Sequence, residues 1–179
     1  MRFRNCAIAL TLLAALASTQ NSQTPVRLDV PYVPTSNEVV EGMLKLAAVQ
    51  KTDTVYDLGC GDGRIVIMAA KRYGAHGVGI DINLDRIQEA RANAKQARVE
   101  NLVTFEEGDL FAADIRNATV VTLYLLPDVN LRLRPKLLAD LKPGTRVVSH
   151  SFDMGDWKPE KEESVDGANI YLWTVPAKK

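Results

Sequence analysis

Residues 55–66 of the chain read VYDLGCGDGRIV, and this stretch decides the fold. An apolar run meets an acid, Gly59, Gly61 and Gly63 alternate with other residues, and an apolar helical pattern begins. Glycines in such a loop allow positive φ and let a ligand press against the backbone. The loop does not fit the dinucleotide fingerprint, because Arg64 holds its third glycine position, and no Gly-Lys-Ser/Thr of a P-loop follows. Taken alone, the glycines also fit a plain strand-to-helix turn.

Strand and helix patterns alternate along the rest of the chain. Strands are expected at 55–58, 77–82, 102–106, 119–125 and 146–152, and helices at 65–73, closed by Gly74, and from Asn83 to about Ala97. Two further strand-like runs, 160–165 and 169–175, flank Asp166-Gly167, which is a hairpin signal. The alternation predicts an α/β fold with a doubly wound, mostly parallel sheet and a C-terminal antiparallel hairpin.

Two local signals predict helix boundaries outside this core pattern. Thr35 and Glu38 have the spacing of a capping box before an apolar helical pattern at 39–47. Pro135 is expected to break the region 128–141 into two helical pieces, because a proline can begin a helix but disrupts its interior. A helix is therefore expected before the first strand, and a broken one between the fourth and the fifth.

Acidic residues follow three successive strands of the expected sheet. Asp57 ends the first strand, Asp81 ends the second and Asp109 follows the third. In doubly wound sheets, ligands bind beyond the carboxyl ends of the strands. Three carboxylates there would repel phosphates and suit hydroxyls, amines or positive charge, as in the sulfonium and ammonium of S-adenosylmethionine. Each acid alone could equally be a turn or capping residue.

Composition limits the function classes. The 179 residues suit one domain, and 22 Lys+Arg against 22 Asp+Glu leave no electrostatic footprint for nucleic acid, although nucleic acid is not excluded. No metal site is expected. Of the two cysteines, Cys60 is interpreted as a small residue tolerated between two glycines.

The N-terminus has the pattern of a secretory signal peptide. Arg2 and Arg4 precede an uncharged run at 6–17, which ends in Ala15-Leu16-Ala17, a small-residue cleavage site. The run is shorter than the roughly 20 apolar residues of a membrane span. We therefore expect a signal peptide at 1–17, a leader at 18–28 and one domain at 29–179, in a periplasmic or secreted protein. The alternatives are an uncleaved N-terminal membrane anchor and a buried N-terminal helix.

With its glycine loop and the acids at its strand ends, the chain resembles the class I, seven-β-strand, S-adenosylmethionine-dependent methyltransferases over about 31–176. More narrowly, PYVPTSNEVVEGML at 31–44 followed by DLGCGDGRIV at 57–66 resembles bacterial relatives of the mitochondrial lysine methyltransferases that act on ATP synthase c-subunit and adenine nucleotide translocase. The resemblance implies a Rossmann-like seven-stranded sheet, S-adenosyl-L-methionine as cofactor and methyl transfer as the reaction.

The resemblance also implies roles for individual residues. Gly59, Gly61 and Gly63 would admit the methionine part of the cofactor, and Asp57 would order that end. Asp81 would accept hydrogen bonds from the ribose hydroxyls, and Ile82 would pack on the adenine. Asp109 would accept from the adenine amino group beside Leu110. Tyr32 and Thr35 would close the site from the N-terminal segment.

The narrower resemblance implies that the methyl acceptor is a lysine of a protein, and the candidate catalytic residues are Tyr124 and Asp128, just past the fourth strand. Tyr124 would pack the lysine stem or accept a hydrogen bond, and Asp128 would attract the ammonium. Alternatively, Tyr124 is strand core and Asp128 caps a helix after Pro127. His150 could line the same crevice or be a hydrogen-bonded core residue.

Two other functions are compatible with the sequence. One is an exported, non-catalytic module that binds S-adenosylmethionine or a nucleoside, because S-adenosylmethionine is made in the cytosol and a fold does not fix a function. The other is a methyltransferase acting on a small molecule. No Asn/Asp-Pro-Pro-aromatic motif follows the fourth strand, which argues against the amino-methylating enzymes of nucleobases.

Overall fold

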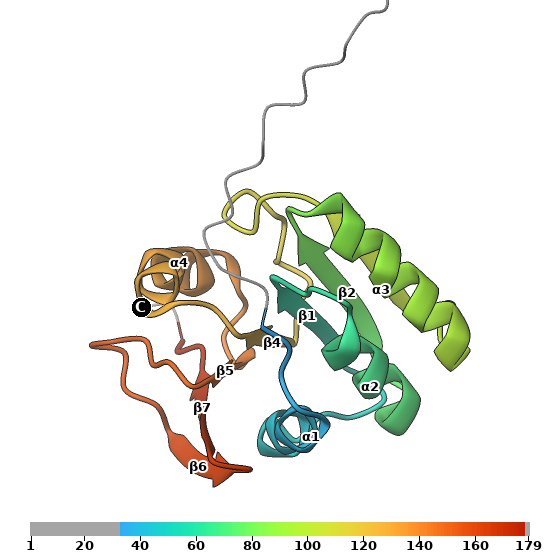
Figure 1. Cartoon of the computed structure of the whole chain (residues 1–179). Helices are drawn as coiled ribbons and strands as arrows, with labels where there is room; N and C mark the ends of the chain where they lie inside the picture. Colours follow the sequence, from blue (N-terminus) through green and yellow to red (C-terminus); the bar gives the residue numbers. More distant parts are fainter. Residues whose placement is uncertain (1–32, 178–179) are drawn as a thin grey trace, which may run out of the picture.

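A seven-stranded sheet forms the centre of the molecule in a computed structural model that describes residues 33–177. Its strand order is β3-β2-β1-β4-β5-β7-β6 (Figure 1). The strands are β1 (Thr54–Leu58), β2 (His76–Asp81), β3 (Val103–Glu107), β4 (Val120–Leu123), β5 (Arg146–His150), β6 (Lys161–Val165) and β7 (Ala168–Thr174). The first five pair in parallel, and β7 is antiparallel to both β5 and β6.

Helices cover both faces of the sheet (Figure 1). They are α1 (Asn37–Leu46), α2 (Arg64–Tyr73), α3 (Leu84–Ala97) and α4 (Pro127–Asp140). On one face, α1, α2 and α3 share a hydrophobic core with residues such as Met43, Val66, Ile87 and Phe105. On the other face, α4 and the 109–118 connection form a second core with residues such as Leu58, Leu123, Leu133 and Trp173. The predicted doubly wound, seven-stranded sheet with a C-terminal antiparallel hairpin is confirmed.

The first helix packs against the C-terminal hairpin. Helix α1 packs against β5, β7 and β6, and the Cβ that Gly42 lacks would lie 2.9 Å from Val165 Cγ2. Ser36 Oγ donates a hydrogen bond to Asp166 Oδ2 over 3.0 Å. Asp166 and Gly167 have φ values of 50° and 76°, as the predicted tight turn requires. The two ends of the domain therefore pack together.

The predicted capping box at Thr35 is wrong by one residue. Ser36 is the N-cap of α1, and its side chain accepts a hydrogen bond from the Val39 amide over 3.3 Å. Glu38 consequently lies one position too early to complete a capping box. The Thr35 hydroxyl instead contacts His150 Nδ1 at 3.1 Å. The Thr35 side chain, which the local pattern assigned to the cap of the helix, therefore makes a long-range contact instead.

The predicted break at Pro135 is also wrong, because α4 runs without interruption from Pro127 to Asp140. Pro135 is exposed, whereas Leu133 and Leu137 are fully buried. The backbone hydrogen bond that a proline cannot donate would have reached the carbonyl of Leu131, whose side chain is 44% exposed. Water can satisfy that carbonyl on the solvent side, so the helix continues.

The expected signal peptide at 1–17, the leader at 18–28 and Tyr32 lie outside the described residues. Within 33–177, none of the helices combines the length and apolar character needed to cross a membrane.

Candidate functional site

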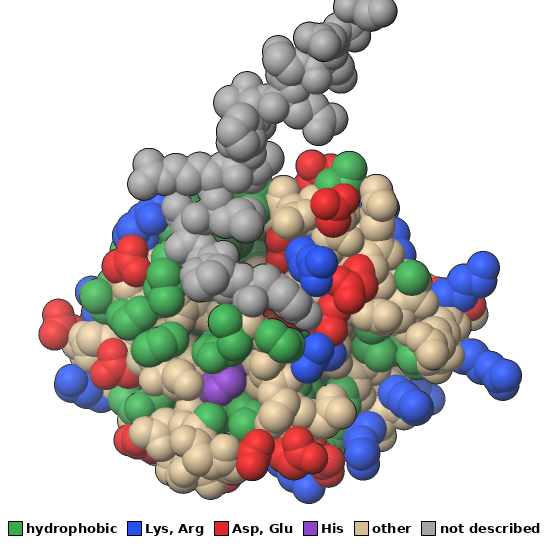
Figure 2. Space-filling model, viewed as in Figure 1, with side chains coloured by type: hydrophobic (Ala, Val, Ile, Leu, Met, Phe, Trp, Pro, Cys, Tyr) green, Lys and Arg blue, Asp and Glu red, His purple; other side chains and the backbone are tan. Residues whose placement is uncertain are grey.

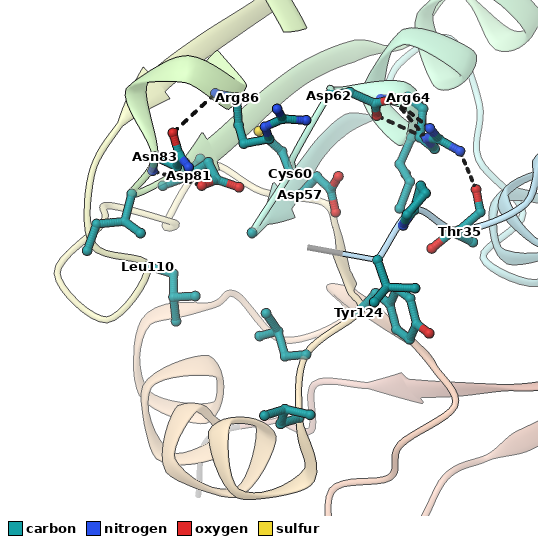
Figure 3. Close-up of a pocket in the computed structure, with 18 of the residues that line it drawn as sticks. Thr35, Asp57, Cys60, Asp62, Arg64, Asp81, Asn83, Arg86, Leu110 and Tyr124 are labelled. Atoms are coloured by element: carbon teal, nitrogen blue, oxygen red, sulfur yellow. Dashed lines mark hydrogen bonds and ion pairs between the residues drawn. The ribbon is translucent and has the colours of Figure 1, made fainter. Parts of the chain in front are cut away.

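A cavity of about 240 Å³ opens at the carboxyl ends of β1, β2, β3 and β4, and Asp57, Asp81 and Asp109 all line it. This is where the strand order reverses, because β1 lies between β2 and β4. In Figure 3, Asp81, Asn83 and Arg86 lie on one side of the pocket, Tyr124 and Thr35 lie on the other, and Asp57 and Cys60 lie between them. The structure therefore brings the three sequence-predicted strand ends to one crevice.

The glycine loop forms part of the pocket wall. Gly59 and Gly61 have φ values of 84° and 52°, and the amides of Gly59 and Cys60 both donate to the Ile80 carbonyl. Gly59 lines the cavity. Gly63, the N-cap of α2 with φ 78°, faces protein instead, because an added Cβ would lie 2.5 Å from the Phe105 ring. The structure therefore gives Gly63 a packing reason that the sequence analysis missed.

Asp81 lies at the end of β2 and lines the pocket. Its Oδ2 accepts a hydrogen bond from the Gly61 amide over 2.9 Å, and its Oδ1 accepts one from the Asn83 amide, also over 2.9 Å. A carboxylate has about four acceptor sites, so each oxygen keeps capacity for a further donor. The arrangement can accept two ligand hydroxyl groups while it holds the loop.

Asp57 is a buried carboxyl group at the pocket wall, with 3% of its surface exposed. Burial raises the pKa of Asp57 to about 7, the Thr122 hydroxyl donates to it over 2.8 Å and opposes this shift, and the nearby Asp81 adds to it. A cationic ligand beside Asp57 would favour the ionised form. Cys60 is buried next to it, and burial raises the pKa of that thiol, which makes it a poor nucleophile.

Three further predicted residues line the same cavity near Asp81. Asp109 Oδ1 accepts a hydrogen bond from the Phe111 amide over 2.8 Å, so this acid also organises a turn, as the alternative interpretation held. Leu110 and Ile82 contribute apolar surface, and Ile82 is 39% exposed. Acidic and apolar groups thus alternate on the side of the pocket where an adenosine was expected.

The pocket also has an apolar lining, which includes Tyr124, Val33, Pro34, Leu126 and Phe152. Because β4 ends at Leu123, two residues earlier than predicted, the Tyr124 side chain reaches the pocket rather than the sheet core. Figure 2 shows apolar side chains gathered in the left half and near the centre of the face that is viewed. This lining suits the aliphatic part of an acceptor.

The structure does not bring Asp128 to the pocket. Asp128 is exposed in the first turn of α4 and is not among the residues that line the cavity. There its negative charge complements the N-terminal end of the helix dipole, which agrees with the alternative interpretation. His150 is buried and is also not a lining residue, but it lies behind Tyr124 with the two ring centroids 3.7 Å apart.

Comparison with known proteins assigns the family. Residues 57–161 match the family described as ANTKMT methyltransferase domain. A protein-lysine N-methyltransferase of Saccharolobus islandicus is 48% identical over 151 residues, which cover 82% of this chain and 94% of that protein. The chain belongs to the ANTKMT methyltransferase-domain family. The predicted resemblance is confirmed, and the chain is an S-adenosylmethionine-dependent methyltransferase.

Other members and neighbours of the ANTKMT methyltransferase-domain family differ in the acceptor that their names give. The mouse adenine nucleotide translocase lysine N-methyltransferase is 36% identical, and the match covers 83% of this chain but 65% of that protein. A crystal structure described as an RNA methyltransferase from Salinibacter ruber, in complex with S-adenosyl-L-homocysteine, is 58% identical with a TM-score of 0.81, over 82% of this chain and 96% of that one. Its bound product supports S-adenosylmethionine as the cofactor.

The pocket fits the cofactor of an ANTKMT methyltransferase-domain protein. Gly59 has no side chain between its backbone and the cavity, and Asp81 can accept hydrogen bonds from ligand hydroxyls. A cationic ligand beside Asp57 would favour the ionised form of this buried carboxyl group. No group of three or more His, Cys, Asp or Glu residues within 33–177 is arranged to hold a metal ion. The acids and the glycine that line the pocket suit a nucleoside derivative that carries a positive charge.

Sequence reasoning missed one connection in this ANTKMT methyltransferase-domain pocket. Arg64 Nη2 pairs with Asp62 Oδ2 at 2.6 Å, and Arg64 Nη1 donates to the Thr35 carbonyl over 2.7 Å (Figure 3). Phe152, which follows β5, was missed as well. The position of Arg64 two residues after an acid in the glycine loop was the available signal for the ion pair, whereas no local signal pointed to the Arg64–Thr35 contact or to Phe152.

Proposed function

We propose that the protein is a protein-lysine N-methyltransferase. The observation that carries the proposal is the 48% identity to the Saccharolobus protein-lysine N-methyltransferase, which extends over 94% of that protein. The mouse relative, at 36% identity, is also named as a lysine N-methyltransferase. Two relatives from distant organisms thus share the acceptor class, and the pocket residues from Asp57 to Phe152 lie within the family match at 57–161.

The second candidate is an RNA methyltransferase, which the description of the 58% identical Salinibacter protein favours. Proteins that bind RNA usually carry an excess of Lys and Arg to neutralise phosphates. This chain has 22 Lys+Arg and 22 Asp+Glu, so it carries no such excess. The electrostatic balance therefore supports a lysine acceptor over a polyanion.

The chemistry of lysine methylation places one demand on the acceptor side. A lysine of ordinary pKa costs about 4–5 kcal/mol to deprotonate at pH 7. Tyr124, Leu126 and Phe152 would remove water from an entering ammonium, and desolvation lowers the pKa of a lysine. The apolar lining thus favours the neutral amine that a methyl transfer needs.

The remaining chemistry requires positioning rather than an acid–base pair. Bound S-adenosylmethionine supplies a methyl group on a sulfonium that is already activated for in-line displacement. Aligning two reactants can contribute roughly 7–11 kcal/mol to lowering a barrier. In the proposal, Asp81 holds the ribose, Ile82, Asp109 and Leu110 hold the adenine, the glycine loop with Asp57 holds the methionine end, and Tyr124 contacts the acceptor.

The test is to follow a labelled methyl group. Purified protein would be incubated with S-adenosylmethionine carrying a tritiated methyl group and an extract of cells that lack its gene. The extract would then be separated into protein, RNA and small molecules. We expect label in the protein fraction that acid hydrolysis releases as methyl-lysine, and excess S-adenosyl-L-homocysteine should suppress it.

The other outcomes separate the alternatives. Label in RNA or in small molecules, with none in methyl-lysine, would refute the lysine assignment and leave the methyltransferase activity standing. Binding of S-adenosyl-L-homocysteine without any transfer would support the non-catalytic module.

A second proposal concerns the location of the protein. Arg2, Arg4 and the apolar run at 6–17 support export with cleavage after Ala17. The intact mass of the protein purified from its own cells tests this. A mass that lacks residues 1–17 is expected, and a full-length mass would favour a membrane anchor or a cytosolic enzyme.

A further inference from the structure

Three residues at the pocket contact one another in series, because His150 contacts both Thr35 and Tyr124. Thr35 Oγ1 lies 3.1 Å from His150 Nδ1, and the His150 and Tyr124 rings stack with centroids 3.7 Å apart and 28° between their planes. Thr35 and His150 are 4% and 6% exposed. The three residues come from the segment before α1, the end of β5 and the position after β4, so only the folded chain brings them together.

Arg64 connects this series of contacts to the glycine loop on the cofactor side of the pocket. Arg64, the first residue of α2 after the glycine loop, donates to the Thr35 carbonyl over 2.7 Å and pairs with Asp62 at 2.6 Å. Asp62, Arg64, Thr35 and Tyr124 all line the cavity (Figure 3). Thr35 is therefore held by the glycine loop through its backbone and by His150 through its side chain.

We propose that His150 is a positioning residue for methyl transfer, which fixes the Tyr124 ring and the Thr35 segment relative to each other on the acceptor side of the pocket. His150 does not line the cavity, so it acts through the two residues that do. The inference deepens the methyltransferase function and does not depend on whether the acceptor is a lysine. A misplacement of about 1 Å at a reacting centre can cost on the order of 100-fold in rate, so the smaller displacement that follows the loss of one contact should cost less.

The state of the imidazole suits this role. Burial lowers the pKa of His150, which favours the neutral ring at pH 7. Among residues 33–177, the hydrogen bond to Thr35 is the one that holds the ring. A neutral imidazole has one donor and one acceptor, and a hydroxyl can pair with either. The contact therefore survives in both tautomers, and the ring stays stacked on Tyr124 without carrying a charge.

The test is a double-mutant cycle on the Thr35–His150 contact. Thr35→Val removes the hydroxyl at nearly constant shape, and His150→Phe removes the nitrogen while it keeps a ring to stack on Tyr124. With total tritium transfer to the extract as the assay, summed over all fractions, each variant should lower kcat about tenfold. The double variant should be no slower than the slower single variant, because both changes remove one interaction. Thr35→Ser should restore most of the activity.

Two controls separate positioning from a structural effect. The affinity for S-adenosyl-L-homocysteine should stay within about twofold of the parent in all variants, because the cofactor-side acids are untouched. The second histidine of the chain, His76, is exposed at the start of β2 and does not line the pocket, so His76→Phe should leave kcat unchanged. Additive losses in the cycle, an unchanged kcat in His150→Phe, or an affinity loss as large as the kcat loss would overturn the proposal.

A spectroscopic measurement tests the Thr35–His150 contact independently of activity. If the parent protein labels nothing in the extract, that result counts against the proposed function and not against the contact. In protein labelled with ¹⁵N-histidine, the Nδ1 resonance of His150 should move in Thr35→Val and stay in place in Thr35→Ser. An Nδ1 resonance that Thr35→Val leaves unchanged would overturn the positioning role.

Discussion

The backbone amide of Gly61 donates a hydrogen bond to Asp81 Oδ2 over 2.9 Å, which ties the glycine loop after β1 to the end of β2. The other oxygen of Asp81 accepts from the amide of Asn83, the residue that caps α3. One carboxylate thus holds a loop and a helix start that both face the pocket. Replacing Asp81 should therefore affect the shape of the site as well as any direct contact to the cofactor.

Asp81→Ala should weaken binding of S-adenosylmethionine by roughly 2–3 kcal/mol, the scale of lost charge-assisted hydrogen bonds. Isothermal titration calorimetry measures this directly. Asp81→Asn keeps one acceptor for a backbone amide and should fall between the parent and Asp81→Ala. Asp114→Ala is the matched control, because Asp114 is an exposed acid paired with Arg116 outside the pocket. Unchanged affinity in a folded Asp81→Ala protein would remove Asp81 from the proposed site.

Asp57 should make the stability of the cofactor-free protein depend on pH. Its pKa is raised from 3.8 to about 7 by burial, so the folded state holds a proton that the unfolded state has released between these values. The contribution to stability is therefore full below about pH 4 and is lost as the pH rises through about 7, by up to about 4 kcal/mol.

Asp57→Asn, which cannot ionise, checks this linkage. The free energy of unfolding of the variant, relative to the parent, should rise between pH 4 and pH 8 in denaturant titrations. Parallel stability curves for the two proteins across this range would show that Asp57 keeps an ordinary pKa.

Gly63→Ala should destabilise the fold by about 2–4 kcal/mol, because a strained positive φ and a steric overlap act together. The added Cβ would meet the Phe105 ring at 2.5 Å and Ala90 at 2.9 Å. Gly167→Ala isolates the backbone effect, since Gly167 has a φ of 76° with nothing within 4 Å of the new atom, and about 1 kcal/mol is expected there. Equal losses in the two variants, measured by thermal unfolding, would rule out the overlap.

Tyr124→Ala should reduce kcat at least tenfold with little change in cofactor affinity, because the ring lines the acceptor side of the pocket. Asp128→Asn should leave kcat within about twofold and cost only a few tenths of a kcal/mol in stability, since Asp128 is exposed in the first turn of α4. Steady-state transfer of tritiated methyl groups measures both. A large kcat loss in Asp128→Asn would return that residue to the catalytic role that the sequence suggested.

Asp53→Ala should destabilise the protein by about 3–5 kcal/mol, as the loss of one partner of a buried ion pair does. The Asp53 carboxylate pairs with Arg146 and accepts hydrogen bonds from the Thr119 hydroxyl and the Gln50 amide, which joins the starts of β1, β4 and β5. These starts lie at the end of the sheet away from the pocket. Cofactor affinity measured below the unfolding transition should therefore be unchanged, and a weakened affinity would contradict a purely structural role.

The sequence predicted the features that repeat locally. Strand and helix periodicity located both ends of every strand to within two residues. The acids at the strand ends pointed to the pocket because the carboxyl ends of parallel strands lie at one edge of the sheet. Asn83 and Gly74 were recognised correctly because capping depends on a few neighbouring residues.

Contacts between distant segments could not be predicted in this way. Thr35 and His150 are 115 positions apart, and the hydrogen bond between them overrode the local preference for a cap at Thr35. Pro135 is tolerated because it faces solvent, which depends on how α4 packs on the sheet. Asp128 stays outside the pocket for a related reason, since the helix begins at Pro127 and carries it to the surface.

The packing of α1 on β5, β6 and β7 has a consequence for the biosynthesis of the protein. A ribosome makes α1 first and β7 last, so Val40 and Met43, which are fully buried in the finished domain, have no partner strand during most of translation. Contacts of such long sequence separation form slowly and leave apolar surface open to aggregation. The domain can close only after synthesis has passed Thr174, and until then the nascent chain exposes apolar residues that the finished domain buries.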